Sequence, residues 1–291
     1  MPPSKIKTDL IAQYFASHAE DVFDEADLEN LLTEKFHEWN LPPSMMPYTF
    51  TQMLLTGCNL EKIHLRSRHY SSLVLYSWKG AATPFTVALS LQGNQSFFSH
   101  ASAMWIHGLS ENNKQIFLNK EQSPKQTRAS SLSQESIDRA FQNQQRRSKM
   151  AYLYKGYTIT LLNGKHTGRA DIETTKAPTG QEVEVTSKER TLIDIAVRPA
   201  YSGGVAQILE AYKRARSQVS VQKMLKLLET FDYAYPYHQS IGFYLKRARY
   251  NHEDQQLLKT KEVKFNFYLS HALRNPAFDP EWKIYFPQSL K

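Results

Sequence analysis

The sequence predicts an α+β protein with two domains, and three observations lead to this fold class. The chain has 291 residues, which is long for a single compact core. Its first 85 residues contain three stretches with helical spacing of apolar residues and then two short extended stretches. Strand-like runs follow, and helical periodicity prevails after residue 186. We therefore expect domains at 1–85 and 86–291, the second mixed α/β with a helical C-terminal part.

Composition limits the class of protein. Hydrophobic residues make up 41% of the chain and charged residues 22%, which is typical of a globular protein in water. No apolar run approaches the roughly 20 residues that span a bilayer, and the N-terminus lacks the apolar core of a signal peptide. The single cysteine, Cys58, excludes an internal disulfide framework. Together these features predict a cytoplasmic protein.

Three helices are expected in the first domain. The first covers 9–19. The second covers 24–39, and Asp24 is placed to cap its N-terminus. The third covers 47–57, because a proline suits the first helical position and a glycine favours the end of a helix.

Two extended runs follow, at 62–65 and 73–76, with 66–72 as the tip of a hairpin. Three helices followed by a β-hairpin is the order of a winged-helix domain. In such a domain the third helix enters the major groove, and the hairpin, or wing, reaches phosphates or the minor groove. The predicted DNA-binding residues of this domain lie on the third helix and the hairpin. They are Tyr48, Thr49, Thr51, Gln52, Thr56, Lys62, Arg66, Arg68 and His69.

The charge layout agrees with that orientation. Between residues 20 and 38 there are eight acidic residues and one lysine, whereas 40–90 contains four basic residues and one acidic residue. The third helix has no Arg or Lys, so base recognition would rest on Gln52, the threonines and Tyr48. A winged helix that makes only protein contacts is the alternative. The net charge of +8 fits a nucleic-acid partner, and it also fits a slightly basic solvated surface.

The second domain is expected to begin with strands. They are placed at 84–91, 115–118 and 181–185, and a strand pair is placed at 152–162 with Asn163-Gly164 as a turn signal. A helix is expected at 99–109.

Residues 121–150 are rich in Gln, Ser and basic side chains, and they predict a long loop or an exposed helix around 136–145. Within this stretch, Arg146 and Arg147 are candidates for an additional phosphate contact. The alternative is a solvated cluster of charges.

The clearest helix of the chain lies at 189–197. Thr186 and Glu189 have the spacing of a capping box, and Arg190 and Asp194 lie one turn apart and can pair across the surface. The apolar positions with helical spacing are Leu192, Ile195 and Ala196. Further helices are expected at 205–215, 221–231, 239–248 and 268–273, followed by a tail at 276–291 that docks on the body.

Three stretches of the chain resemble signatures of the AbiEi family, the antitoxins of type IV bacterial toxin–antitoxin systems. They are the Ser-His-Ala-Ser-Ala-Met-Trp-Ile-His-Gly-Leu run at 99–109, the Glu-Arg-Thr-Leu-Ile-Asp-Ile-Ala-Val-Arg-Pro run at 189–199, and Ile-Gly-Phe-Tyr-Leu at 241–245. The resemblance implies an N-terminal winged-helix DNA reader joined to an antitoxin domain. Such a bacterial repressor would bind double-stranded operator DNA with inverted repeats and control its own operon. It would counteract a nucleotidyltransferase-like toxin without requiring a stable complex.

Catalytic and metal sites find weaker support. Cys58 and His64 would need a thiolate oriented on the imidazole, and a small packed cysteine is the simpler interpretation. The His64/His69 and His100/His107 pairs lack the spacing of metal ligands. We expect no enzyme activity, cofactor or metal.

One enzymatic alternative stays open. Asp171, Glu182 or Glu184, and Lys188 follow the order of acids and lysine in metal-dependent nucleases, in which carboxylates hold Mg²⁺. The alternative function is therefore a winged-helix protein with a nuclease as its C-terminal domain.

Overall fold

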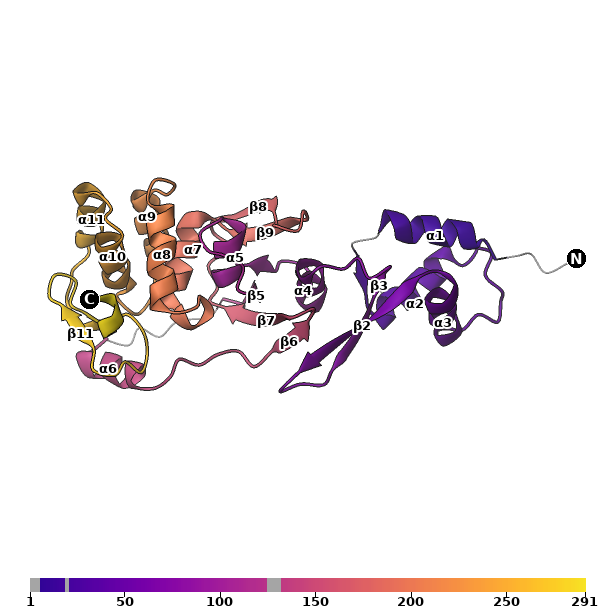
Figure 1. Ribbon diagram of the computed structural model, residues 1–291, viewed down its shortest axis with the longest axis horizontal. Coiled ribbons are helices and arrows are strands. Elements are labelled where there is room, and N and C mark those ends of the chain that lie inside the picture. The colour runs from indigo at the N-terminus through magenta and orange to yellow at the C-terminus, as the bar shows by residue number, and fades with distance from the viewer. Residues whose placement is uncertain (1–5, 19–20, 125–131) are drawn as a thin grey trace, which may run out of the picture. The chain divides into compact units, whose positions relative to one another are not determined.

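The computed structural model describes residues 6–18, 21–124 and 132–291 (Figure 1). The chain forms two compact units. The first consists of Met1–Asn94 with Lys149–Ile159, and the second of Gln95–Ser148 with Thr160–Lys291. Both contain helices and strands, which confirms the α+β class. Among the described residues, no helix is long and apolar enough to cross a membrane.

The first unit begins with the three predicted helices, α1 (Thr8–Ser17), α2 (Glu25–Lys35) and α3 (Pro47–Gly57). Asp24 caps α2 as predicted. Its side chain accepts a hydrogen bond from the backbone N–H of Asp27, and the Asp27 carboxylate accepts one from the N–H of Asp24. Residue 19, where the first helix was expected to end, lies outside the described residues.

A sheet with strand order β1-β3-β2-β6 accompanies these helices. The predicted hairpin is β2 (Leu60–Ser67) and β3 (Leu73–Trp78). The outer strands are β1 (Val22–Phe23), which pairs with β3, and β6 (Ala151–Tyr154), which pairs with β2. The sequence did not predict either of these pairings. Strand β6 reaches the hairpin from more than 80 residues further along the chain, and such a long-range contact leaves no local signal.

The helices pack on a core of buried aromatic and aliphatic side chains. Trp39 is fully buried and stacks on Phe50 of α3, with ring centroids 6.2 Å apart. Phe15 of α1 and Leu31 of α2 belong to the same cluster. This core fixes which side of α3 faces inward.

Residues 84–91 do not form the predicted strand. They form helix α4 (Pro84–Gln92) of the first unit. Thr83 caps this helix, because its hydroxyl oxygen accepts a hydrogen bond from the backbone N–H of Thr86. The hydroxyl oxygen of Thr86 accepts one from the backbone N–H of Thr83. The strand prediction followed a weak alternation of apolar and polar residues. The capping pair and the proline at the first helical position outweigh that alternation.

The second unit contains a mixed sheet with strand order β7-β5-β4-β9-β8. Its strands are β4 (Phe97–Phe98), β5 (Gln115–Glu121), β7 (Tyr157–Gly164), β8 (Ile172–Lys176) and β9 (Glu182–Thr186). Asn163-Gly164 is part of β7, so the prediction of a turn there is wrong. The turn between β6 and β7 is Lys155-Gly156, whose φ angles of 45° and 78° match a two-residue hairpin turn with both central residues at positive φ.

Helices dominate the rest of this unit. They are α5 (His100–Ile106), α6 (Gln134–Gln142), α7 (Lys188–Val197), α8 (Val205–Ala215), α9 (Val221–Phe231), α10 (Tyr237–Arg247) and α11 (His252–Lys259). Helix α7 packs against α5, α8, α9 and α10 and lies at the centre of the unit (Figure 1).

The C-terminal tail docks on this helical body, as predicted. A small sheet of β10 (Phe267–Tyr268), β12 (Ile284–Phe286) and β11 (Ala277–Asp279) replaces the helix expected at 268–273. Trp282 is fully buried, and its ring lies where a Cβ on Gly242 would come within 2.3 Å. Glycine is therefore required at this position of α10.

Two details of α7 differ from expectation. The N-cap is Ser187, whose hydroxyl accepts a hydrogen bond from the N–H of Arg190 at 3.2 Å. The Thr186 hydroxyl bonds Thr191 instead. The predicted surface pair of Arg190 and Asp194 is in fact buried, with side chains 3% and 11% exposed. The helix is apolar or paired on nearly every side, so its spacing pattern could not identify an outward face.

Candidate nucleic-acid interface

Helix α3 turns a polar side away from the core of the first unit. Phe50 and Leu54 are fully buried, and with 3.6 residues per turn the opposite side of the helix carries Tyr48, Gln52 and Thr56. Tyr48 is 76% exposed. Gln52 is half-buried at the centre of that side. The helix can therefore present an amide and a phenol to a ligand.

The two remaining candidates on α3 differ in position. Thr49 is exposed beside Tyr48, whereas Thr51 is half-buried and lies about 100° around the helix from Gln52. Thr56 donates its hydroxyl to the carbonyl oxygen of Gln52 at 2.9 Å. Its oxygen and methyl group are then the parts left for a ligand.

The hairpin carries several exposed basic side chains. Lys62 and Arg66 lie on the exposed side of β2, and Arg68 and His69 lie at the tip, also exposed. Lys62, Arg66 and Arg68 form no ion pair with any residue that the structure describes. The hydroxyl oxygen of Ser67 accepts hydrogen bonds from the N–H groups of His69 and Tyr70, both at 3.3 Å, and orders the tip.

The prediction placed Arg66 in the tip, but Arg66 lies within β2, opposite Leu153 of β6. The hairpin is thus supported along one edge by a fourth strand. A supported strand holds its side chains in a fixed direction, which favours a defined contact over a mobile arm.

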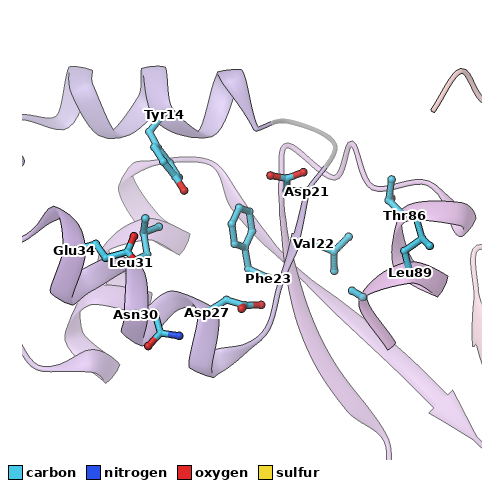
Figure 2. A pocket seen from close by; sticks show the side chains of 11 residues that line it. Tyr14, Asp21, Val22, Phe23, Asp27, Asn30, Leu31, Glu34, Thr86 and Leu89 are labelled. Carbon is cyan, nitrogen blue, oxygen red and sulfur yellow. The ribbon is translucent and has the colours of Figure 1, made fainter. Parts of the chain in front are cut away.

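An acid-lined hollow of about 500 Å³ lies on another side of the first unit (Figure 2). Asp21, Asp27 and Glu34 contribute carboxylates, while Tyr14 and Phe23 contribute rings. Carboxylates repel phosphates, so this hollow does not suit nucleic acid. The residues that line this hollow include none of the hairpin cations.

Arg146 and Arg147 belong to the second unit and form a separate candidate contact. Both are exposed. Their segment is held by the Gln145 amide, which donates to the carbonyl of Val197 at 3.3 Å, and by Arg198, which donates to the carbonyl of Arg146 at 3.5 Å. The exposed Arg198 thus adds a third cation that sequence reasoning missed, because the contact spans about 50 residues.

The second unit also contains a buried ionic cluster of Arg190, Glu121 and Asp194. The Arg190 guanidinium lies 5.0 Å from the ring of Phe97 and 5.2 Å from that of Phe231. It donates to a Glu121 oxygen at 3.2 Å and lies 3.7 Å from an Asp194 oxygen. A cation enclosed by two rings and two carboxylates is unavailable to a nucleic acid.

The two carboxylates of this cluster titrate in opposite directions. Burial opposes ionisation of Glu121, but hydrogen bonds from Thr167, Arg169 and Arg190 outweigh it and lower the pKa. Only Arg190 favours the ionised form of Asp194, so burial dominates and raises the pKa of Asp194 to about 6. Glu121 therefore keeps its charge to a lower pH than Asp194 does.

The residues of the nuclease alternative are engaged elsewhere. Asp171 pairs with Lys223 at 2.8 Å, Glu184 pairs with Arg169 at 2.5 Å, and Lys188 donates to the amide oxygen of Gln218 at 2.7 Å. Glu182 is exposed on β9. Among the described residues, no group of three His, Cys, Asp or Glu side chains could hold a metal ion.

The remaining catalytic and metal candidates are packed or hydrogen-bonded within the fold. Burial raises the pKa of the Cys58 thiol, and the residue packs in the first core. Burial lowers the pKa of His100 to about 3, with its Nδ1 2.8 Å from the Ser99 hydroxyl. The Nε2 of His107 lies 2.6 Å from the carbonyl oxygen of Thr186. Both histidines are hydrogen-bonded and at least partly buried.

Comparisons with known proteins add a likeness of fold. No protein-family model and no curated protein matches the chain. Among solved structures, the chain is similar to the Rv2827c protein from Mycobacterium tuberculosis, with a TM-score of 0.61 and 14% sequence identity. The match covers 96% of this chain and 90% of that one. The chain therefore shares its fold, across nearly its whole length, with this mycobacterial protein.

Proposed function

We propose that the chain is a DNA-binding repressor and antitoxin of a bacterial type IV toxin–antitoxin system, acting in the cytoplasm. The observation that carries the DNA-binding part is the pairing, within one unit, of an exposed polar helix side with hairpin cations that lack acidic partners. Phosphates supply the charge that such cations lack. The order α1-β1-α2-α3-β2-β3 supports a winged-helix module with α3 as the recognition helix.

Base recognition would then rest on few groups. Gln52 lies at the centre of the outward side of α3, and a glutamine amide can bond an adenine edge in a bidentate manner. The threonine methyl groups suit contact with thymine methyl groups. Because α3 offers no arginine for guanine, DNA shape would supply part of the specificity.

The antitoxin part rests on the resemblance of three stretches to the AbiEi family. In the second unit these stretches include α5, α7 and α10, and α7 packs against both others. Their residues thus contribute to one continuous body, which supports reading them as the framework of a single domain. The proposed partners are operator DNA with inverted repeats, which two protomers would bind together, and a nucleotidyltransferase-like toxin.

The experiment uses the full chain, because β6 of the first unit comes from residues 151–154. Truncation near residue 85 would remove β6 and leave β2 without this partner strand. The variant Arg66→Glu with Arg68→Glu should abolish repression of a reporter driven by its own promoter. It should still rescue growth when the adjacent toxin is expressed.

A matched control reverses two exposed cations of α8 in the second unit, Lys213→Glu with Arg214→Glu, and should retain repression. Repression by the hairpin variant would contradict DNA contact by the wing. A wild-type chain that fails to rescue growth would contradict the antitoxin role while leaving DNA binding intact.

A further inference from the structure

Strand β2 has an edge that is only partly covered. Strand β3 pairs with it from Leu60 to Leu65. On the other edge, β6 is in register with Arg66 and Ser67. In the described part of the chain no other strand neighbours this edge of β2. By the same register Tyr154, the last residue of β6, falls opposite Leu65. Residues 61–64 of β2 therefore have no described strand beside them on this edge.

The space beside residues 61–64 is a groove held open by the β6–β7 turn. Tyr154 donates its hydroxyl to the carbonyl of Ala82 at 2.9 Å, and Lys155 donates to the carbonyl of Gly80 at 2.9 Å. These bonds fasten the turn to the residues after β3. The groove encloses about 350 Å³, and its walls include β2 residues 61–64 and β6 residues 153 and 154.

The two sides of β2 differ in character. Lys62, His64 and Arg66 alternate along the strand and are exposed, whereas Ile63 and Leu65 point the other way and are buried. Leu153, which lines the groove, is 45% exposed. Glu61 also lines the groove, with its carboxylate beside Gly80. The groove thus combines three basic side chains with one carboxylate and one exposed leucine.

We propose that this groove binds an extended acidic peptide of a partner protein, which adds to the edge of β2 as a further strand. Strand addition gives affinity through main-chain hydrogen bonds and specificity through alternate side chains. A peptide side chain opposite Lys62, His64 or Arg66 would be acidic, because opposite charges on facing residues stabilise a strand pair. The intervening side chains would be apolar, on the side of Ile63 and Leu65.

The same residues explain why the groove would select its ligand. Lysine and arginine on an exposed strand edge discourage pairing with neutral or basic strands. The exposed side chain of Leu153 favours a protein partner over a nucleic acid, for which it offers no hydrogen bond. Lys62 and Arg66 also belong to the proposed DNA contact, so a peptide and DNA would compete for this strand, and an oligonucleotide competitor distinguishes the two ligands.

The test is fluorescence anisotropy of the full chain with a labelled peptide that alternates glutamate and valine. The same peptide with proline in place of its central valine, which cannot complete the ladder, should bind about tenfold more weakly. Lys62→Glu with Arg66→Glu should also weaken binding at least about tenfold. The control Lys213→Glu with Arg214→Glu should bind as the wild type does.

Hydrogen exchange distinguishes strand addition from simple charge attraction. The peptide should slow amide exchange in residues 61–64 of the wild type. Lys62→Gln with Arg66→Gln provides a milder variant if the double charge reversal unfolds the protein. No binding of the peptide, equal binding of the proline peptide, or no protection of these amides would overturn the proposal. Displacement of the peptide by a short thymidine oligonucleotide at equal concentration would assign the groove to nucleic acid instead.

Discussion

Arginines of the two units have opposite environments. On the hairpin of the first unit, Arg66 and Arg68 are exposed, and no described carboxylate pairs with them. In the second unit, Arg190 is 3% exposed and lies against Glu121, Asp194 and two aromatic rings. A buried guanidinium must be paired to offset its desolvation, whereas an exposed one remains available to a ligand. Arg66 and Arg68 therefore suit the proposed binding of DNA, whereas Arg190 suits a structural role.

The largest expected effect is on Arg190. Arg190→Ala should lower the free energy of unfolding by about 3–5 kcal/mol, because it leaves the Glu121 carboxylate buried without its cation. Urea denaturation of the full chain would measure the loss. Arg68→Ala is the matched control and should leave the denaturation midpoint unchanged. Similar denaturation midpoints for the two variants would contradict the stabilising role of the buried Arg190.

The next effect concerns pH. Because burial raises the folded-state pKa of Asp194 from 3.8 to about 6, its contribution to stability is present below pH 4 and is lost as pH rises through 6. Asp194→Asn removes that loss. Between pH 4 and pH 7.5, the free energy of unfolding of the variant should therefore rise by roughly 3 kcal/mol relative to that of the wild type.

Comparing variant with wild type cancels the contribution of His100. Its lowered pKa acts in the opposite direction, since stability is lost as pH falls below about 6.5. Parallel pH profiles for wild type and Asp194→Asn would show that Asp194 is ionised as an ordinary surface carboxylate, and the ionic cluster would need another account.

Helix caps give a smaller contrast between the units. Asp24→Ala removes an exposed cap of α2 and should cost about 1 kcal/mol. Ser187→Ala removes a buried cap of α7 that also donates to Asp171, so it should cost more, up to about 2 kcal/mol. Thermal denaturation would rank them, and equal shifts would show that burial adds nothing to the cap.

The local features of the first unit could be predicted from the sequence. Helix α3 begins at Pro47 and ends at Gly57 because proline and glycine act locally, and Asp24 caps α2 for the same reason. The pairing of Arg66 with Leu153 could not be predicted, because it joins residues 87 positions apart. Local sequence carries no record of such register.

The same limit applies to the second unit. The spacing of Arg190 and Asp194 correctly indicated one helix turn, but the pair is buried because Glu121, 69 residues earlier, completes it. Helix α11 (His252–Lys259) has a single buried residue, Leu258, so its apolar periodicity was too weak to identify. Helix α4 was misread although Thr83, Pro84 and Thr86 carried its start signal.

The central claim is that the hairpin cations contact DNA phosphates while Arg190 does not. The most direct measurement is the salt dependence of full-chain binding to duplex promoter DNA, for wild type and for Arg66→Ala with Arg68→Ala. Each lost phosphate contact should reduce the slope of log K against log salt concentration by about 0.9, so the double variant should lose roughly 1.8. An unchanged slope, with weaker or equal binding, would contradict the assignment of the hairpin to DNA.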